Sequence, residues 1–595
     1  MIAQIRPKKA DYAENLRRLG GVFAQVAGMG EPPDLIVFPE TVLTGYFLEG
    51  GVRELTVTGG TLFRDLAAQH ALSGAPPVDV ALGFYEEFRN RYYNSALYAS
   101  LGGAEPRIRH VHRKVFLPTY GLFDEERFVE HGHSVRAFDT GWGRAALAVC
   151  EDVWHSVVPT LAALDGAQLI IVPSASPARG VDPAEDRTDD AAGRPASVRR
   201  WEMLIRRVAE EHGVYVALAQ LVGFEGGKGL QGSSLIVGPS GDVLARGPLF
   251  EEALLTATLN LEEITRARFE QPLLADLETQ LLNLLRSADG SPPPVEYAAA
   301  DEGSYHAEPG PTARHPIVSS LPDSDPLEID PALTEQWLVE FLRDEVVRRR
   351  GFEKGIVGLS GGIDSSVTAT VAARALGCQN VIGVRMPYRT SSPESLEHAA
   401  QVAEQLGIQL LTVDITGAVD GYIEAVGGES DPSRRGNVMA RMRMITLFDL
   451  SMKYQALPLG TGNKTERLLG YFTWHGDDAP PVNPLGDLFK TQVRGLAQHL
   501  GVPEAVIHKP ATADLVRGQT DEADLGISYD RADRILHWLL RGLKDHEIVS
   551  LGFEPDEVAL VSKRLHATHW KRRLPTVAMV SSTAIGESYL RPVDY

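Results

Sequence analysis

The sequence contains very little cysteine, with 2 residues in a chain of 595. Two thiols cannot build the disulfide framework that small secreted domains need, so this scarcity indicates a reducing compartment. No apolar stretch comes near the roughly 18 residues of a membrane-spanning helix. The N-terminal sequence MIAQIRPKKADYAENLRRL also lacks the apolar core of a signal peptide. We therefore expect a cytoplasmic protein that has no membrane partner.

Positive charge is also scarce, because 58 Lys and Arg residues stand against 79 Asp and Glu residues, for a net charge of −21. Nucleic-acid-binding proteins usually carry a basic surface, so this balance argues against DNA or RNA as the main partner. The negative net charge does not exclude binding of small anionic ligands, because a local loop can bind phosphate in an acidic protein. The length of 595 residues predicts about two to four domains.

Nine prolines lie between residues 292 and 331. Such a stretch holds neither a long helix nor a central strand. We therefore interpret residues 276–329 as a connector between domains at 1–275 and 330–595, with one long surface loop as the alternative. Before the connector, apolar runs such as DLIVFP alternate with helix-like stretches and predict an α/β domain with buried strands. After it, a βαβ rhythm predicts a doubly wound parallel sheet.

Three reactive side chains follow apolar runs in the N-terminal half. Glu40 ends LIVFPE, Lys114 lies in HRKVFLP, and Cys150 ends AALAVC. The thiolate is the nucleophilic form of cysteine. A carboxylate can take the thiol proton, and an ammonium can stabilise both the thiolate and a developing oxyanion. Taken singly, such a cysteine is usually a core residue and such a Glu or Lys is usually solvated.

In this order, the contexts VFPE, RK-x-x-LP and CED resemble the nitrilase superfamily over roughly residues 1–275. The resemblance implies an αββα sandwich that carries a Glu–Lys–Cys triad. It makes Glu40 the general base and Lys114 the oxyanion stabiliser. Cys150 becomes the nucleophile that attacks a carboxamide, forms a thioester and releases ammonia.

The segment YGLFDEERF (120–128) is similar to the glutamine-amidase branch of that superfamily. This likeness implies a glutamine pocket, with Glu125 as a fourth polar residue near the triad. The candidate lining residues are Tyr46, Tyr120, Phe123, Glu125, Glu151, Trp154 and Ser176. The alternative for each is a surface or packing role. The first strand begins almost at Met1, so we expect an N-terminus that is trimmed relative to the family.

In the C-terminal half, GLSGGIDSS (358–366) follows a strand-like run and opens a helix. Gly361 and Gly362 let backbone N–H groups approach an anion, and the helix start adds partial positive charge. No GK[ST] follows, so this is not a Walker A loop. The string SGGIDS resembles the pyrophosphate-binding loop of the ATP pyrophosphatase family, whose members cleave ATP to AMP and pyrophosphate, usually by adenylating an acceptor oxygen.

Later segments narrow this resemblance. Sulfur-transfer members commonly need further cysteines, but here the only other one is Cys378, which we expect to pack behind an alanine-rich helix. The segments that resemble NAD synthetases over roughly residues 330–595 are NVMARMRMITLFDL (437–450), PLGTGNKTERLLGYFTWHGD (458–477), PLGDLFKTQV (484–493), ADLGISYD (523–530) and HWKRRLP (569–575). Together with its N-terminal half, the chain resembles the family of glutamine-dependent NAD synthetases.

This resemblance implies that the carboxylate of nicotinic acid adenine dinucleotide attacks the α-phosphate of ATP, and that ammonia displaces the adenylate. Mg²⁺, which prefers oxygen ligands, would be held by Asp364 and Glu466. The residues implied to bind ATP are Ser360, Gly361, Gly362, Asp364, Ser365, Ser366, Thr461, Lys490 and Thr512. Those implied to bind the dinucleotide are Asn437, Arg441, Trp474, Asp487 and Lys571, with Arg572 beside the last. The stretch APPVNP after Asp478 departs from the family's glycine-rich continuation.

Most ammonia is protonated at neutral pH, so an amidase in the same chain would supply the free base at a high effective concentration. We therefore expect a tunnel from Cys150 to the region of Asp364 and Glu466. The resemblance also implies a homo-oligomer with paired synthetase domains, as a dimer or an octamer.

Two other interpretations stay open. The first is a different glutamine-dependent adenylating ligase, against which NVMARMRM and GYFTWHGD argue. The second is an amidase with a degenerate nucleotide-sensing module, against which the intact Asp364, Glu466 and Lys490 argue.

Overall fold

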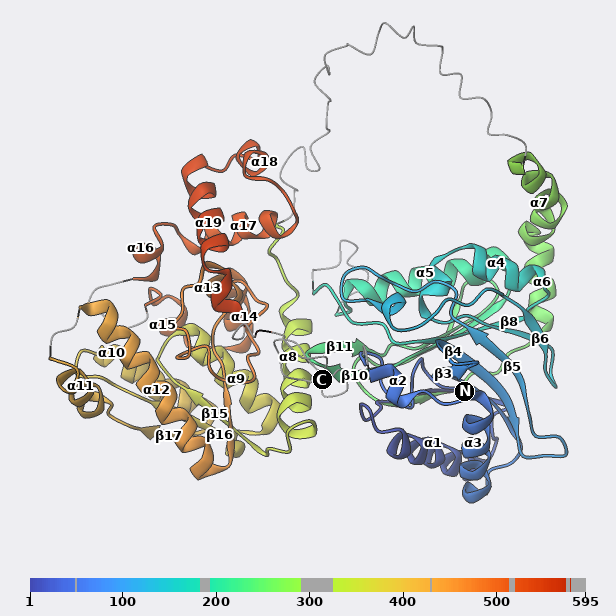
Figure 1. The fold of residues 1–595 in the computed structure, drawn as a ribbon, viewed down its shortest axis with the longest axis horizontal. Coiled ribbons are helices and arrows are strands. Elements are labelled where there is room, and N and C mark those ends of the chain that lie inside the picture. The colour runs from blue at the N-terminus through green and yellow to red at the C-terminus, as the bar shows by residue number, and fades with distance from the viewer. Residues whose placement is uncertain are drawn as a thin grey trace, which may run out of the picture. The chain divides into compact units, whose positions relative to one another are not determined.

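The computed structural model describes residues 1–48, 51–181, 193–289, 325–428, 431–512, 520–573 and 578, with residues 282–289 as backbone only. The chain divides into two compact units (Figure 1). The first holds residues 1–180 and the described residues of 194–289, and the second holds residues 181 and 193 and the described residues from 325 onward. Each unit is described by itself.

The first unit contains two six-stranded sheets. One has the order β14-β1-β2-β3-β4-β5, with β1 (Ile2–Gln4), β2 (Leu35–Val37), β3 (Val78–Phe88), β4 (Arg91–Leu101), β5 (Arg107–Arg113) and β14 (Ala253–Leu255). The other has the order β13-β12-β9-β8-β7-β6, with β6 (Ala137–Asp139), β7 (Arg144–Leu147), β8 (Leu169–Ser174), β9 (Tyr215–Gln220), β12 (Leu235–Val237) and β13 (Val243–Arg246). A hairpin of β10 (Val222–Glu225) and β11 (Lys228–Gln231) stands beside them.

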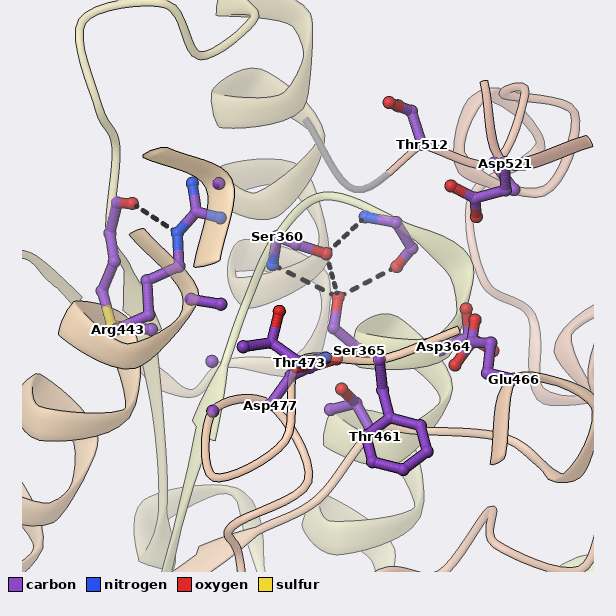
Figure 2. A pocket seen from close by; sticks show the side chains of 18 of the residues that line it. Ser360, Asp364, Ser365, Arg443, Thr461, Glu466, Thr473, Asp477, Thr512 and Asp521 are labelled. Atoms are coloured by element: carbon purple, nitrogen blue, oxygen red, sulfur yellow. Dashed lines mark hydrogen bonds between the residues drawn. The ribbon is translucent and has the colours of Figure 1, made fainter. Parts of the chain in front are cut away.

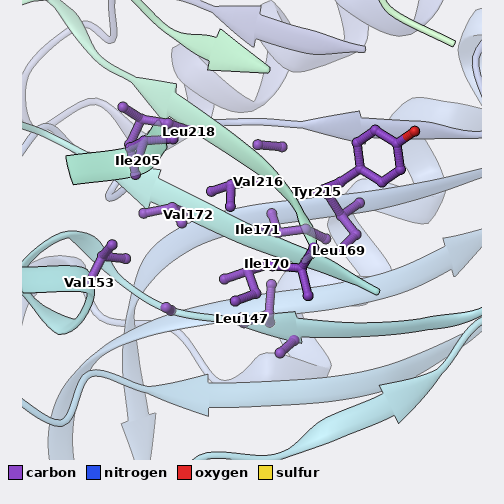
Figure 3. Packing of buried hydrophobic residues seen from close by; sticks show 14 of the residues in the cluster. Leu147, Val153, Leu169, Ile170, Ile171, Val172, Ile205, Tyr215, Val216 and Leu218 are labelled. Carbon is purple, nitrogen blue, oxygen red and sulfur yellow. The ribbon is translucent and has the colours of Figure 1, made fainter. Parts of the chain in front are cut away.

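Alternating side chains explain why the two sheets stack. In β2, Val37 packs toward the second sheet, whereas its neighbour Ile36 packs toward the helices on the other side. Figure 3 shows the core on the second sheet, where Ile170, Val172 and Val216 pack together. The resulting order of helix, sheet, sheet and helix confirms the predicted αββα sandwich.

The helices of the first unit cover the outer faces of these sheets (Figure 1). The helices α1 (Tyr12–Ala27) and α3 (Gly59–Ser73) pack on the first sheet through Phe23 and Leu66. The helices α4 (Val157–Leu164) and α5 (Ala196–His212) cover the second through Val158 and Ile205. The remaining helices are α2 (Val52–Leu55), α6 (Glu262–Glu270) and α7 (Leu273–Asp289).

The predicted connector is only partly visible. Helix α7 runs to Asp289, so position 276 falls inside a helix whose leucines recur every three or four residues. Residues 290–324, which carry most of the prolines, lie outside the described residues. The domain boundaries therefore stay predictions.

The second unit is built on a four-stranded parallel sheet in the order β17-β16-β15-β18. Its strands are β15 (Lys354–Gly358), β16 (Val381–Arg385), β17 (Gln409–Thr412) and β18 (Ala456–Leu459). Helices cover both faces, because Val357 packs among α9 and α14, whereas Ile356 packs against α12. This alternation confirms the predicted doubly wound sheet.

The helices of the second unit are α8 (Pro331–Leu342), α9 (Ile363–Leu376), α10 (Pro393–Leu406), α11 (Thr416–Ala425), α12 (Pro432–Tyr454), α13 (Lys464–Leu469), α14 (Lys490–Leu500), α15 (Glu504–Ile507), α16 (Asp521–Leu525), α17 (Tyr529–Leu540), α18 (Asp545–Ser550) and α19 (Pro555–Ala567). A π-helical turn, Arg343–Arg348, continues α8 and buries Val346. Over the whole described part of the chain, no helix is both long and apolar enough to cross a membrane.

Candidate active sites

The ends of strands from both sheets bring three predicted residues of the first unit together. Glu40 lies three residues after β2, Lys114 directly follows β5, and Cys150 opens a short 3₁₀ turn (Cys150–Trp154) just after β7. All three side chains are buried. The Nζ atom of Lys114 lies 2.9 Å from Oε1 of Glu40, and the charges of both residues act on the thiol of Cys150. The predicted triad is therefore one cluster.

Glu125 joins this cluster, as predicted. Its Oε2 lies 2.7 Å from Lys114 Nζ, and Asn94 Nδ2 donates to both Glu40 Oε1 and Glu125 Oε1, at 2.7 and 2.5 Å. Burial raises the pKa of Glu125 above its usual range, although the nearby Lys114 opposes this shift. Burial alone would lower the pKa of Lys114, but the two carboxylates outweigh it and raise that pKa. One ammonium thus faces two buried carboxylates.

The thiol of Cys150 is arranged for activation by a base. Its backbone has a left-handed φ of 45°, a strained value that side chains rarely adopt outside functional sites. Burial, followed by the charge of Glu40, raises the pKa of Cys150, so the resting group is a thiol. Within the described residues, Glu40 Oε2 is buried and has no hydrogen-bond partner. This oxygen is free to accept a proton.

Backbone shape also contributes to this site. Strand β3 passes directly beneath Glu40, and a Cβ added to Gly83 would lie 2.5 Å from the Cα of Glu40. Only glycine allows such a close approach of the two backbones. Ser174 and Ser176 flank the thiol, since Ser174 Oγ lies 3.2 Å and Ser176 Oγ 3.9 Å from Cys150 Sγ.

Most of the predicted glutamine-pocket residues gather around this cluster. The ring of Phe123 contacts those of Tyr46 and Tyr120, with centroids 6.0 and 5.8 Å away. The hydroxyl of Tyr120 donates to the carboxylate of Glu151 at 3.0 Å. Trp154 is different, because its half-exposed ring packs on Trp201 of α5. No contact in the described chain ties it to the triad.

Sequence reasoning gave no role to Asp152, which holds the site together. Its Oδ1 accepts hydrogen bonds from the backbone N–H groups of Val115 and Phe116, at 2.9 and 3.0 Å. Its Oδ2 accepts from the N–H of Val149 and from His112 Nε2, both at 2.9 Å. One carboxylate thus joins the segment after Lys114 to the turn that carries Cys150. The available signal was an acid two residues after the nucleophile.

Two further residues of this unit escaped the sequence analysis. The buried carboxylate of Glu225, at the end of β10, accepts from the N–H groups of Tyr46 and Phe47, at 3.1 and 2.8 Å. It therefore fixes the loop that carries the Tyr46 ring. The guanidinium of Arg179 lies against Gly121, 3.7 Å from the place where a Cβ would stand.

The second unit contains a cavity of about 750 Å³ at the carboxyl ends of its parallel strands (Figure 2). Of the predicted residues, those that line it are Ser360, Gly362, Asp364, Ser365, Asn437, Thr461, Glu466, Lys490 and Thr512. The loop before α9 is held by its own side chains: Ser360 Oγ and Ser365 Oγ lie 3.1 Å apart, and Gly362 N–H donates to Ser360 Oγ at 3.2 Å. Ser366 lies buried behind it and donates to the carbonyl of Gly362.

Lys490, at the start of α14, lies between the two predicted metal ligands. Its ammonium pairs with Asp364 and with Glu466 Oε1, the latter at 3.5 Å. Figure 2 shows the two carboxylates next to each other at the edge of the cavity. Burial and then the charge of Asp364 raise the pKa of Glu466 to about 8. One ammonium therefore leaves this carboxylate pair short of positive charge.

This pair fits a divalent cation. A Mg²⁺ ion would supply the missing charge, and carboxylate oxygens are the ligands it prefers. Among the described residues, no group of three or more His, Cys, Asp or Glu side chains is arranged to hold a metal. Two carboxylates are nevertheless enough for Mg²⁺, which commonly takes its other ligands from water and nucleotide phosphates.

Asn463 and Asp533 position these charged groups. Asn463 Nδ2 donates to Asp364 Oδ1 at 3.0 Å, and its own N–H donates to Glu466 Oε2 at 3.2 Å. Asp533 of α17 accepts from Thr465 Oγ1 and from the N–H of Thr491, the latter at 2.9 Å. Because Thr465 precedes Glu466 and Thr491 follows Lys490, Asp533 joins the two helices that carry the site.

The residues predicted to bind the dinucleotide are only partly brought together. Arg441 Nη2 donates to the carbonyl of Trp474 at 3.1 Å, and Lys571 Nζ donates to the carbonyls of Gly470 and Phe472, at 2.7 and 2.6 Å. Both cations therefore hold the segment that borders the cavity beside Asn437. Asp487 does not line the cavity: its side chain is 97% exposed and pairs with Lys464.

The expectation for Cys378 was wrong, since its side chain is exposed. Helix α9 ends at Leu376, and Cys378 begins the short surface turn Cys378–Asn380 that leads into β16. The alanine-rich face of the helix therefore packs without it.

Comparisons with known proteins match each of the two units. A family profile described as carbon-nitrogen hydrolase matches residues 2–269, and one described as NAD synthase matches residues 335–575. A glutamine-dependent NAD(+) synthetase of Thermotoga maritima is 33% identical over 609 aligned positions, which span 100% of this chain and 97% of that protein. An NH(3)-dependent NAD(+) synthetase of Chlorobaculum parvum is 47% identical over 270 residues, which span 45% of this chain and 97% of that protein.

Solved structures show the same fold over nearly the whole length. The glutamine-dependent NAD+ synthetase from Acinetobacter baumannii has a TM-score of 0.68 at 24% identity, and 98% of this chain and 96% of that chain are covered. The enzyme of the same description from Cytophaga hutchinsonii has a TM-score of 0.69 at 16% identity, with 96% and 93% covered. Because the curated relative matches from end to end and both family profiles are present, the chain belongs to the glutamine-dependent NAD(+) synthetase family.

Proposed function

We propose that this chain makes NAD(+) from nicotinic acid adenine dinucleotide, ATP and glutamine, and releases AMP, pyrophosphate and glutamate. One observation carries this proposal: a single chain contains two separate centres in which a lysine bridges two carboxylates. One centre lies beside a buried thiol, and the other opens on a cavity of about 750 Å³. We assign the first to a glutaminase domain at residues 1–275 and the second to a synthetase domain at residues 330–595.

In the glutaminase domain, Glu40 Oε2 takes the proton of Cys150 as Sγ attacks the carboxamide carbon of glutamine. The carbonyl oxygen becomes an oxyanion, which the ammonium of Lys114 stabilises. Glu40 gives the proton to the leaving nitrogen. The C–N bond then breaks, so that ammonia departs and the thioester remains. Glu40 then takes a proton from the water that attacks the thioester carbon, and returns it to Sγ as the C–S bond breaks and glutamate departs. The unpartnered Glu40 Oε2 and the protonated resting thiol support this order of steps.

Glutamine carries an α-ammonium and an α-carboxylate, which need opposite charges in the protein. Glu151, held by Tyr120, offers a carboxylate for the first, and Arg179 beside Gly121 offers a guanidinium for the second. The rings of Tyr46 and Phe123 would enclose the aliphatic part of the substrate.

In the synthetase domain, Asp364 and Glu466 would hold Mg²⁺, which neutralises phosphate charge when bound. An oxygen of the dinucleotide carboxylate attacks the α-phosphorus of ATP, and pyrophosphate leaves. Lys490 stabilises the negative charge that develops at this phosphate. Ammonia then attacks the activated carboxyl carbon, and AMP departs. The loop Ser360–Ser365 lines the cavity at the start of α9, where its hydroxyls and the helix N-terminus would receive the phosphates.

Ammonia formed at Cys150 would be lost as ammonium if it first entered solvent. We therefore retain the tunnel as part of this proposal, supported by the burial of Cys150 and by the fusion of both domains in one chain. Glutamine labelled with ¹⁵N in its amide, offered with excess unlabelled ammonium, tests it. Retention of ¹⁵N in NAD(+) is expected, and full dilution of the label would contradict the tunnel.

A homo-oligomer with paired synthetase domains also remains part of the proposal. Light scattering of the purified chain is expected to give a mass of at least two copies, in the range from a dimer to an octamer. The mass of one copy at micromolar concentration would contradict this part.

A product assay tests the reaction. Purified chain with nicotinic acid adenine dinucleotide, ATP, Mg²⁺ and glutamine should give NAD(+), AMP, pyrophosphate and glutamate in equal amounts. A panel of other carboxylates should give no amide. Amidation of one of them in preference to the dinucleotide would favour a different adenylating ligase. ATP binding without AMP formation would favour a sensing module.

A further inference from the structure

The cavity of the synthetase unit holds a lysine to which no role has been given. Its lining contains three cationic side chains, those of Arg443, Lys490 and Lys509. Lys490 is occupied by the two carboxylates of Asp364 and Glu466. Arg443 projects from α12, and Figure 2 shows it across the cavity from that pair. Lys509 lies just before Thr512 and reaches the cavity from a different element.

Within the described residues, the ammonium of Lys509 contacts a hydroxyl and no carboxylate. Its Nζ donates to the hydroxyl of Ser395 at 2.7 Å, and no carboxylate of the described chain lies within ion-pair distance of it. A hydroxyl orients an ammonium without neutralising it. By contrast, the ammonium of Lys490 is already paired with the carboxyl groups of Asp364 and Glu466.

Ser395 also places this ammonium beside the glycine loop. The backbone carbonyl of Ser395 backs directly onto Gly361, since a Cβ on Gly361 would lie 2.0 Å from that oxygen. Gly361 has a φ of 75°, so its backbone turns in a conformation that favours glycine. One buried residue therefore contacts the loop through its backbone and Lys509 through its side chain. Lys509 is anchored where the loop turns into α9.

We propose that Lys509 binds the β- and γ-phosphates of ATP and stabilises pyrophosphate as it leaves, an inference that rests on the adenylation proposed above. As the carboxylate oxygen bonds to the α-phosphorus, the bond from that phosphorus to the bridging oxygen breaks. The bridging oxygen keeps the electron pair and leaves with pyrophosphate. The ammonium of Lys509 offsets the charge that this group gains.

This assignment divides the work between two lysines. Lys490 acts with the carboxylate pair at the phosphorus under attack, whereas Lys509 acts at the departing group. A polyanionic leaving group needs a net positive partner, which the Lys490 group cannot provide without a bound cation. Donors from Ser360, Gly362 and the helix start add partial charge only.

Binding of inorganic pyrophosphate with Mg²⁺ to the full-length chain tests the proposal by calorimetry. Lys509→Ala should bind pyrophosphate at least ~10-fold more weakly than wild type and should lower kcat/KM for ATP by ~10–100-fold with ammonium as donor. Lys509→Arg should recover most of the affinity, because it restores the charge. Ser395→Ala should weaken binding by roughly threefold, because it frees the ammonium without removing it. Lys563→Ala, an exposed lysine on α19, is the matched control and should match wild type.

Glutamine hydrolysis should stay at the wild-type rate in every variant, which verifies that the chain is folded. Equal pyrophosphate affinity in wild type and Lys509→Ala would overturn the proposal, as would an equal loss in Lys509→Arg and Lys509→Ala. Failure of the wild-type chain to form NAD(+) would contradict the proposed function instead, because pyrophosphate binding does not depend on that reaction.

Discussion

The two centres of this chain share one arrangement of charges and differ in how far it is sealed from solvent. In the glutaminase unit, Lys114 is 0% exposed and its partners Glu40 and Glu125 are 0% and 7% exposed. In the synthetase unit, Lys490 is 3% exposed, and its partners Asp364 and Glu466 are 17% and 18% exposed. In both groups one ammonium faces two carboxyl groups.

This difference matches the two chemistries. The sealed centre can hold one proton on one carboxylate, which suits transfer of a thiol proton to a leaving amine. The open centre faces a large cavity, where a metal ion and phosphates can reach its oxygens. A lysine between two carboxylates therefore serves proton transfer when it is enclosed and polyanion binding when it is open.

Removing each lysine gives the largest expected effect and tests this comparison directly. Lys114→Met should lower glutamine hydrolysis by ~10³-fold or more, because the oxyanion loses its cation. Synthesis of NAD(+) from ammonium should stay normal in this variant. Lys490→Met should lower NAD(+) synthesis from both donors by a similar factor and leave glutamine hydrolysis intact. Donor-resolved steady-state kinetics measure both, and loss of ammonium-driven synthesis in Lys114→Met would break the comparison.

Removing one metal ligand is expected to be nearly as severe. Asp364→Ala should strongly lower NAD(+) formation with glutamine and with ammonium alike, because the second carboxylate alone holds Mg²⁺ more weakly. Titration with Mg²⁺ should show a rise of at least ~10-fold in the concentration needed for any residual activity. Activity near the wild-type level at ordinary Mg²⁺ would contradict the ligand assignment.

Asp152, the buried carboxylate that holds the first centre together, gives a further test of the comparison. Burial alone would raise its pKa, but the hydrogen bond from His112 outweighs this effect and lowers it. The folded pKa thus lies below the unfolded value of about 3.9, so its stabilisation is complete above that pH and is lost as pH falls through the folded pKa. At pH 7, Asp152→Asn should destabilise the first unit by about 3 kcal/mol. Calorimetry should show this difference unchanged from pH 7 to 5 and smaller below ~4.

Asp533 is the corresponding buried carboxylate of the second unit. Burial raises its pKa, whereas the pKa of Asp152 is lowered. The folded pKa of Asp533 lies above the unfolded value, so its ionised form opposes folding at neutral pH. Stability of the second unit therefore falls as pH rises through the folded pKa. Asp533→Asn should leave the first unit unchanged and lower ammonium-driven synthesis.

The smallest effect is expected at the second cysteine. Cys378→Ser should change either activity by less than ~2-fold, since this side chain is exposed and lies on a surface turn. A thiol reagent should label Cys378 in the folded chain much faster than Cys150, which is buried. A strong loss of activity on this change would show that only part of the chemistry has been located.

Residues within short motifs were predictable from the sequence. Glu40, Lys114 and Cys150 each lie within a few residues of the end of a strand, where functional side chains gather in α/β folds. The loop Ser360–Ser365 was predictable for the same reason. Asp152, Asp533, Glu225 and Lys509 were not, because their roles come from partners that lie far away in the sequence.

The structure departs from the sequence pattern where a motif residue faces away from its neighbours, and the roles predicted for Asp487 and Trp154 stay predictions. Asp487 lies within a matched segment but points to solvent, and Trp154 packs on α5 rather than toward the triad. Cys378 follows a buried helix, yet the helix ends before it. A sequence pattern indicates which segments approach the site, and only side-chain direction decides which residues enter it.

The most direct test of two coupled centres is the change Cys150→Ala, measured as NAD(+) formation with glutamine and, separately, with ammonium. The variant should lose glutamine-driven synthesis completely and keep ammonium-driven synthesis at the wild-type rate. Retained use of glutamine, or equal loss with both donors, would contradict the assignment of one nitrogen-releasing centre and one adenylating centre.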